Sequence, residues 1–81
     1  MNMSYREYLK NRLYSLLGEK ENNGEWECFL DNIIIELMSL PDTYKKFSLI
    51  GKLSVCRFLS YKYFRKTIFE CMNLIEEVDV K

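Results

Sequence analysis

The sequence lacks histidine, alanine and glutamine, and it contains only one proline, three glycines and three cysteines. Without histidine there is no Ser–His pair, no histidine general base and no histidine metal ligand. The glycines are isolated from one another, which excludes a glycine-rich phosphate loop. These absences argue against a catalytic centre. We expect a protein that is not an enzyme and has no catalytic residue, no metal and no cofactor.

The cysteines indicate the compartment. Cys28, Cys56 and Cys71 are odd in number and widely spaced, so they form neither a CxxC pair nor a disulfide framework. This usage favours a reducing, intracellular setting, and we expect a cytoplasmic protein. No apolar run approaches the roughly 20 residues that a membrane span needs, and the first ten residues contain no apolar signal region. We therefore expect no membrane partner.

Length and composition favour one globular domain over residues 1–81. Apolar residues make up 48% of the chain and charged residues 30%, which is typical of a folded domain rather than a disordered one. Isoleucine, tyrosine, lysine and asparagine are abundant. This bias suggests an AT-rich coding genome, such as that of a low-GC bacterium, a phage or other mobile element, or a large DNA virus.

An apolar stripe at helical spacing organises the last part of the chain, from Ser60 to Val78. Its members recur every three or four residues, as expected for one side of an α-helix. The stripe consists of Tyr61, Phe64, Ile68, Cys71, Ile75 and Val78. Ser60 is a suitable N-cap, because its hydroxyl can accept a hydrogen bond from an unpaired amide of the first turn.

Two more amphipathic helices are predicted in the first half of the chain. Ser4 and Glu7 have the spacing of a capping box, and the helix they begin is expected to end at Gly18, before a surface loop over residues 19–24. Its stripe is Tyr5, Leu9, Leu13, Leu16 and Leu17. The next helix is predicted for about residues 25–40. Its stripe is Trp26, Leu30, Ile33, Leu37 and Leu40.

Residues 41–59 show no single apolar stripe. Pro41 suits the first position of a helix, but the apolar residues after it point in almost every direction on a helical wheel. This pattern predicts either one central helix that is buried on most sides, which we favour, or two short helices that meet near Gly51. Ser48, Gly51 and Ser54 share roughly one side and would let another helix approach closely. Together these segments predict an all-α fold, a single compact bundle of four to five helices.

Positive charge is concentrated in one segment. The chain has twelve acidic and twelve basic residues, yet seven bases and no acid lie within residues 45–66. These bases are Lys45, Lys46, Lys52, Arg57, Lys62, Arg65 and Lys66. The segment either neutralises the acidic flanks within the bundle or presents a basic face to an acidic partner.

The favoured functional hypothesis is a small protein-binding module, a regulator or inhibitor that occupies an acidic surface of a partner protein. The alternative is a nucleic-acid-binding regulator that uses the basic segment, with a helix-turn-helix formed around Leu59 and Ser60. A helix-turn-helix is disfavoured by a turn without glycine and by the neutral net charge.

Six residues are predicted to form the partner-binding surface, and a homodimer is also expected, because the apolar stripe of the last helix is unbroken and the outlying Phe69, Ile35 and Tyr14 leave apolar surface. A structural subunit that dimerises through its last helix is a third possibility. The six residues are Lys45, Lys52, Lys62, Arg65, Lys66 and Phe69. Phe69 lies on the polar side of the last helix, one turn from Arg65, so it is either an exposed anchor or covered by another helix. Ile35 lies opposite the Trp26 stripe, and we expect it to be covered and to belong to the core.

Overall fold

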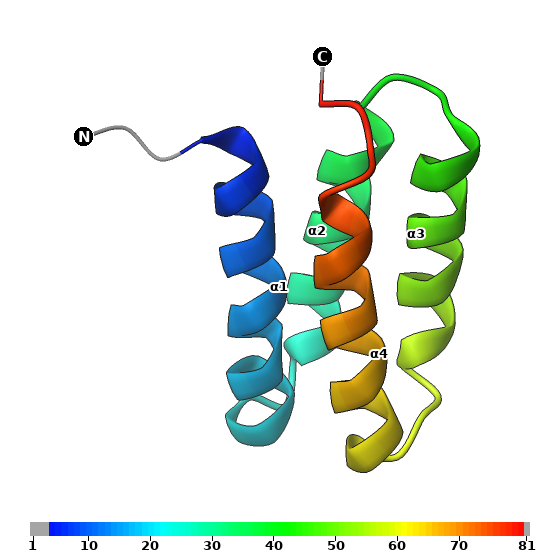
Figure 1. Cartoon of the computed structure of the whole chain (residues 1–81). Helices are drawn as coiled ribbons and strands as arrows, with labels where there is room; N and C mark the ends of the chain where they lie inside the picture. Colours follow the sequence, from blue (N-terminus) through cyan, green and yellow to red (C-terminus); the bar gives the residue numbers. More distant parts are fainter. Residues whose placement is uncertain (1–3, 81) are drawn as a thin grey trace.

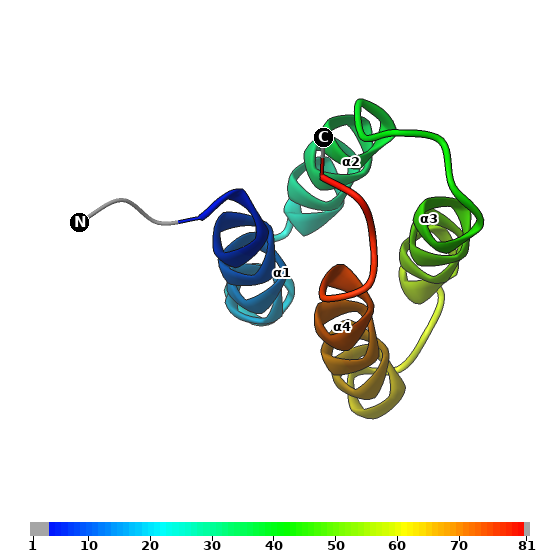
Figure 2. The ribbon, with the colours of Figure 1, turned by 45° about the horizontal axis from the view of Figure 1, so that its top comes forward.

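The computed structural model describes residues 4–80 and contains four helices and no strand in that range. They are α1 (Tyr5–Asn22), α2 (Trp26–Met38), α3 (Tyr44–Cys56) and α4 (Tyr61–Ile75). The helices alternate in direction, and each packs against the two that are its neighbours around the bundle (Figures 1 and 2). α1 lies diagonally opposite α3, and α2 lies opposite α4. The predicted all-α bundle is confirmed, with four helices.

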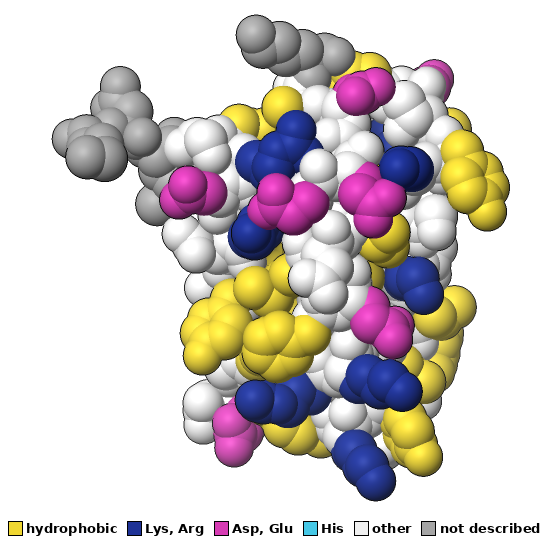
Figure 3. Space-filling view, viewed as in Figure 1, with side chains coloured by type: hydrophobic (Ala, Val, Ile, Leu, Met, Phe, Trp, Pro, Cys, Tyr) yellow, Lys and Arg dark blue, Asp and Glu magenta, His cyan; other side chains and the backbone are white. Residues whose placement is uncertain are grey.

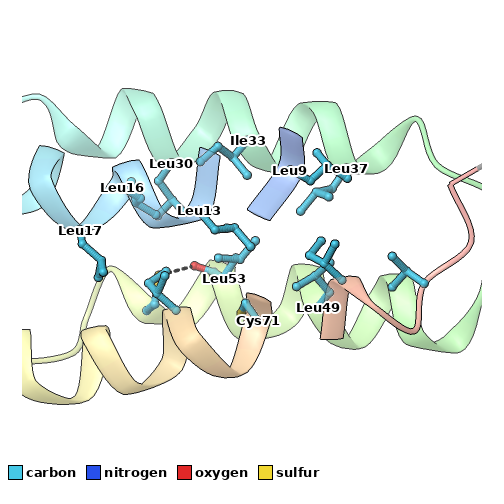
Figure 4. Packing of buried hydrophobic residues seen from close by; sticks show 14 of the residues in the cluster. Leu9, Leu13, Leu16, Leu17, Leu30, Ile33, Leu37, Leu49, Leu53 and Cys71 are labelled. Atoms are coloured by element: carbon cyan, nitrogen blue, oxygen red, sulfur yellow. Dashed lines mark hydrogen bonds between the residues drawn. The ribbon is translucent and has the colours of Figure 1, made fainter. Parts of the chain in front are cut away.

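The core consists of most of the predicted stripes of α1, α2 and α4 together with one side of α3 (Figure 4). Of the predicted members, Trp26 is only partly buried, and Tyr5 and Tyr61 are each 38% exposed. Leu13, Leu30, Leu53 and Ile68, one from each helix, are all completely buried. Cys56 and Cys71 are also buried, and the Cys56 thiol donates to the carbonyl of Leu53 at 3.0 Å. Burial raises the pKa of the Cys56 thiol to about 11 and that of Cys71 to about 12, so both remain neutral thiols.

The helix starts follow local chemistry. The hydroxyl of Ser4 accepts a hydrogen bond from the amide of Glu7 at 3.1 Å, which confirms the predicted serine cap. Thr43, not Pro41, caps α3, and its hydroxyl accepts from the amide of Lys46. Ser60 stands at the N-cap of α4, but its side chain makes no capping hydrogen bond.

Gly18 does not end the first helix. Its φ is not positive, and α1 continues for another turn to Asn22. Glutamate and lysine follow the glycine and favour helix, so one glycine is tolerated inside it. The helix ends at its C-cap, Asn23, whose amide donates a hydrogen bond to the carbonyl of Glu19 at 2.8 Å. The predicted loop over residues 19–24 is therefore reduced to its last residues.

Two helix ends are capped by basic side chains from a neighbouring helix. α2 and α4 have no basic residue in their own last turns. The buried ammonium of Lys46 donates to the carbonyls of Met38 at 3.0 Å and Leu40 at 2.9 Å, at the end of α2. The Arg6 guanidinium donates to the carbonyls of Ile75 and Val78 at the end of α4. Each cation satisfies orphan carbonyls and stabilises the negative end of a helix dipole.

α3 is a single helix, as favoured, but it is not buried on most sides. Its inner face supplies Leu49, Leu53 and Cys56 to the core, while much of its apolar outer face is exposed. Ile35 of α2 is 66% exposed, so its predicted place in the core is wrong. The physical reason is the same for both helices: with two neighbours each and no fifth helix, α2 and α3 keep an uncovered outer side.

Candidate functional site

Every basic residue of the α3 region forms an ion pair within the chain. Lys45 pairs with Glu77 at 2.8 Å, Lys46 with Asp42 at 2.6 Å, Lys52 with Glu70 at 3.7 Å, and Arg57 with Asp31 at 2.6 Å. Apart from the pair of the buried Lys46, these pairs lie at the surface, where they add little stability but neutralise charge locally. Two of the six predicted binding residues, Lys45 and Lys52, are therefore engaged in bridges from α3 to α4 and its C-terminal turn.

The other three predicted cations lie together in the first two turns of α4. Among the residues that the structure describes, no carboxylate lies within ion-pair distance of Lys62, Arg65 or Lys66, and all three are exposed. These three residues form what we call the α4 basic face. They stand at the positive end of the helix dipole, and α4 has no acid in its first turn to offset them.

Phe69 lies at the edge of the α4 basic face. It is half-buried and packs edge-to-face against Tyr14 of α1, with ring centroids 6.3 Å apart. The guanidinium carbon of Arg65 lies 5.1 Å from the Phe69 ring centroid, a cation–π arrangement one helical turn apart. Phe69 therefore lies between the two predicted alternatives: part of the ring rests on the core and part remains open beside Arg65.

The charge segregation is visible on the face formed by α4. Figure 3 shows lysine and arginine gathered over the lower half of α4, next to a hydrophobic patch on its α1 side. In the upper half, acidic and basic side chains alternate. This alternation includes the pairs of Lys10 with Glu76 and Lys45 with Glu77. The neutral net charge of the chain thus conceals one local patch of uncompensated positive charge.

α3 and α4 do not form a helix-turn-helix. They run antiparallel, side by side, as neighbours of the bundle (Figures 1 and 2). A DNA-reading pair crosses at about 90–120° and leaves one helix free to enter the major groove. Here the buried face of α4 includes Phe64 and Ile68, both completely covered.

The stripe of α4 is likewise unavailable for a dimer. Phe64, Ile68, Cys71, Ile75 and Val78 are at most 2% exposed within one protomer. These five members of the stripe are covered by the other helices, and only Tyr61, at 38% exposure, is open to a second copy. The predicted homodimer stays a prediction. Any self-association must use a different surface.

A groove of about 490 Å³ lies between the start of α1 and the end of α4. Three of its charged groups have partners: Arg6 caps α4, and Lys10 bonds to Glu76 at 2.5 Å. The Lys10 ammonium lowers the pKa of Glu76 below its usual 4.5, so this carboxylate is ionised at neutral pH. The groove offers an ion pair rather than a matched acid and base.

Sequence reasoning missed a hydrogen-bonded cluster between α1 and α2. Glu36 accepts hydrogen bonds from Tyr5, Tyr8 and Arg12, each at 3.3 Å. Burial, followed by the charge of Glu36, raises the pKa of the Tyr5 hydroxyl. These hydrogen bonds hold α1 against α2, although the buried Nε of Arg12 has no hydrogen-bond partner among the described residues. The spacing of Tyr8 and Arg12 was the only local signal, since Glu36 is distant in sequence.

Sequence reasoning also missed the outer face of α3. Its apolar residues were interpreted as buried, but Tyr44, Phe47, Val55 and Phe58 are among the large exposed hydrophobic residues of the molecule. Hydrophobic side chains recur down the right-hand edge of Figure 3, over α3. The signal was present in the helical wheel, where apolar residues surrounded the segment.

Within residues 4–80, no helix combines the length and apolarity needed to cross a membrane. No group of three or more carboxylate and cysteine side chains in this range is arranged to hold a metal ion. In comparisons with known proteins, no family model, no curated protein and no solved structure matches this chain.

Proposed function

We propose that this chain is a non-enzymatic protein-binding module, a small cytoplasmic regulator or inhibitor that recognises an acidic surface of a partner protein. The observation that carries the proposal is the α4 basic face. The four bases of the α3 region have acidic partners within the chain, whereas Lys62, Arg65 and Lys66 have none among the described residues. Uncompensated charge on one face steers association with a surface of opposite sign.

The position of these cations adds support. Lys62 lies in the first turn of α4, where a positive side chain at the positive end of the helix dipole weakens the helix slightly, by about 0.3–1 kcal/mol at an exposed site. Residues that are unfavourable for the local structure around them tend to occur at functional sites. Arg65 and the open part of the Phe69 ring supply the arginine–aromatic composition in which interface hot spots concentrate.

A protein partner is favoured over nucleic acid for two reasons. Three cations are few for the phosphate backbone, since binding that depends on counterion release typically uses six to ten contacts. The α3–α4 pair also lacks the crossing of a helix-turn-helix. A neighbouring half-buried aromatic suits the desolvated centre of a protein interface better than a phosphate contact.

The test compares three forms of the chain as bait in nuclease-treated extract of the producing cell. The first is the wild type, the second carries Lys62→Glu, Arg65→Glu and Lys66→Glu, and the third is a control with Lys45→Gln and Lys52→Gln. We expect an acidic protein that is retained by the wild type and the control but lost from the triple variant. Retention of the same proteins by all three forms would overturn the proposal.

Two measurements sharpen the outcome. With the captured protein purified, charge reversal on the α4 basic face should slow association more than it speeds dissociation, because the charges act mainly during encounter. A short DNA duplex titrated at several salt concentrations tests the alternative. Tight DNA binding that weakens steeply with salt, and that is lost in the triple variant, would replace the acidic protein with nucleic acid as the partner.

A further inference from the structure

The outer face of α3 carries an exposed apolar stripe that nothing in the protomer covers. Tyr44 is 86% exposed, Phe47 57%, Val55 55% and Phe58 82%. With Gly51 between them, these residues follow the helical spacing 44, 47, 51, 55 and 58, and we call the five the α3 stripe. Phe58 lies just beyond α3, but its amide still bonds to the carbonyl of Val55 at 3.1 Å, so it continues the helical course.

No charged side chain interrupts this stripe. The basic side chains of the α3 region form ion pairs with acids of α2, α4 and the adjoining segments, so their charge is neutralised beside the stripe and not on it. Between its aromatic ends, the outer face carries only the small or apolar residues Ser48, Gly51, Ser54 and Val55. Removing such a face from water strips no ionised group of its hydration, which favours an apolar contact over a charged partner.

Gly51 is unexplained within one protomer. It lies inside α3, its φ is not positive, and a Cβ added there would meet nothing within 4 Å. Glycine inside a helix is less favourable than alanine, because its freer unfolded backbone loses more entropy. Nothing in the protomer requires glycine at this position, and the same holds for Gly18 in α1. Gly51 differs because it lies in the middle of an exposed apolar stripe, where the absent side chain would permit a second helix to approach closely.

The stripe is symmetric in sequence about Gly51. Tyr44 and Phe58 lie seven residues before and after it, and Phe47 and Val55 lie four residues before and after it. Ser48 and Ser54 flank it at three residues on either side. If two copies of α3 cross antiparallel at Gly51, each large side chain meets an apolar partner and the small residues meet at the centre. A two-fold axis requires this kind of self-complementary surface.

The exposed area of the stripe is that of a small interface. If a fully exposed aromatic side chain presents about 200 Å², the stripe offers on the order of 500 Å² of apolar surface. A standard interface buries about 800 Å² per partner, and weak interfaces bury less than about 600 Å² per partner, so the stripe has the area of a weak dimer contact.

We infer that this chain forms a two-fold symmetric homodimer through the α3 stripe, with two α3 helices crossing antiparallel at Gly51. The occupant of the stripe is a second copy of the same surface. The inference stands apart from the proposed function, because it uses the outer face of α3 and not the α4 basic face. The dimer would carry two α4 basic faces.

The first test measures mass and affinity. Light scattering on the full chain at about 100 µM should give twice the 9.8 kDa mass of one chain if the dissociation constant is micromolar. A monomer mass at that concentration would overturn the inference, and a different protein would then be the candidate to cover the stripe. This result would not bear on the α4 basic face, whose test is capture of an acidic partner.

The second test uses a matched pair of glycines. A Cβ at Gly18 in α1, like one at Gly51, would meet nothing within 4 Å, and both positions are exposed, so a leucine side chain can extend into solvent at either one. Gly51→Leu should raise the dissociation constant roughly tenfold or more, because the side chain blocks the helix crossing. Gly18→Leu should leave the dissociation constant unchanged. Equal constants for the two variants would place the dimer contact elsewhere.

A crosslinking test locates the two-fold axis. In a Cys28→Ser background, which removes the exposed native thiol, Gly51→Cys should form a disulfide-linked dimer under mild oxidation, because a residue on the axis faces its own copy. Ser15→Cys, at an exposed position of α1, is the control and should remain monomeric on a non-reducing gel. Equal crosslinking at both positions would contradict the inferred geometry.

Discussion

The ammonium of Lys46 in α3 lies 3.0 Å from the carbonyl oxygen of Met38, the last residue of α2. Lys46 also bonds to the carbonyl of Leu40 and to the Asp42 carboxylate, and the residue is only 3% exposed. Lys46→Met keeps the apolar stem but leaves two carbonyls of the α2 terminus without their donor. We expect a loss of about 1–3 kcal/mol in the free energy of unfolding, measured by urea titration.

Lys45 provides the control for that measurement. Its side chain is 51% exposed and its bridge to Glu77 lies at the surface. Lys45→Met should change the free energy of unfolding by less than about 1 kcal/mol, as expected for an exposed ion pair. Equal losses at the two positions would show that Lys46 acts as an ordinary surface cation.

Leu53→Ala and Ile68→Ala should each lower the free energy of unfolding by roughly 2–4 kcal/mol, the usual cost of truncating a buried aliphatic side chain. Both side chains are completely buried, one on α3 and one on α4. Denaturant midpoints measure the loss. Val55→Ala, on the exposed side of α3, should have a much smaller effect when it is measured at low protein concentration.

Phe69→Ala should destabilise the fold by about 1–2 kcal/mol, less than the 3–5 kcal/mol expected for a fully buried aromatic ring, because only part of the ring is covered. Thermal melts of the variant and of Phe69→Leu measure it. A Phe69→Ala loss above about 4 kcal/mol would assign the ring wholly to the core and remove it from the partner-binding surface.

The three thiols should react at very different rates. Cys28 is exposed, whereas burial raises the pKa of the Cys56 thiol to about 11 and that of Cys71 to about 12. Only the thiolate is nucleophilic, so Ellman's reagent at pH 8 should modify one thiol quickly and the other two only as the protein unfolds. Rapid modification of all three in the native protein would contradict the buried positions.

Stability should depend on pH through Glu76. Hydrogen bonding from Lys10 lowers its pKa below 4.5 in the folded chain, so its contribution is present above pH 4.5 and is lost as the pH falls through the lowered folded value. The difference in urea midpoint between the wild type and Glu76→Gln should therefore be larger at pH 7 than at pH 3. A difference that does not change between these pH values would show that the carboxylate has no charge-dependent role.

Three of the four helices could be predicted from the sequence because each buries a single face. On α1, α2 and α4 the apolar residues repeat every three or four positions, and those positions form the core. The boundaries were less predictable. Gly18 remains inside α1 because the glutamate- and lysine-rich turn that follows it favours helix. A glycine interpreted as a helix stop does not take account of the helix propensity of the residues after it.

The site was harder to predict because charge pairing is a tertiary property. Lys45 and Lys62 look alike in sequence, yet Lys45 meets Glu77 across 32 residues while Lys62 meets no carboxylate in the described chain. The apolar residues of α3 were misinterpreted for a related reason. An apolar residue was assumed to be buried within its own chain, and Tyr44 at 86% exposure shows that this assumption fails.

The cap that Arg6 places on α4 has a consequence for the order of folding. Its guanidinium bonds to the carbonyls of Ile75 and Val78, 69 and 72 residues further along the chain. Such a contact closes almost the longest loop available to this chain, and its entropy cost delays its formation. The last turn of α4 can therefore become fully protected from amide hydrogen exchange only after α1 has docked. Amide exchange at the start of α1 and at the end of α4 should then be coupled, although the two segments lie at opposite ends of the sequence.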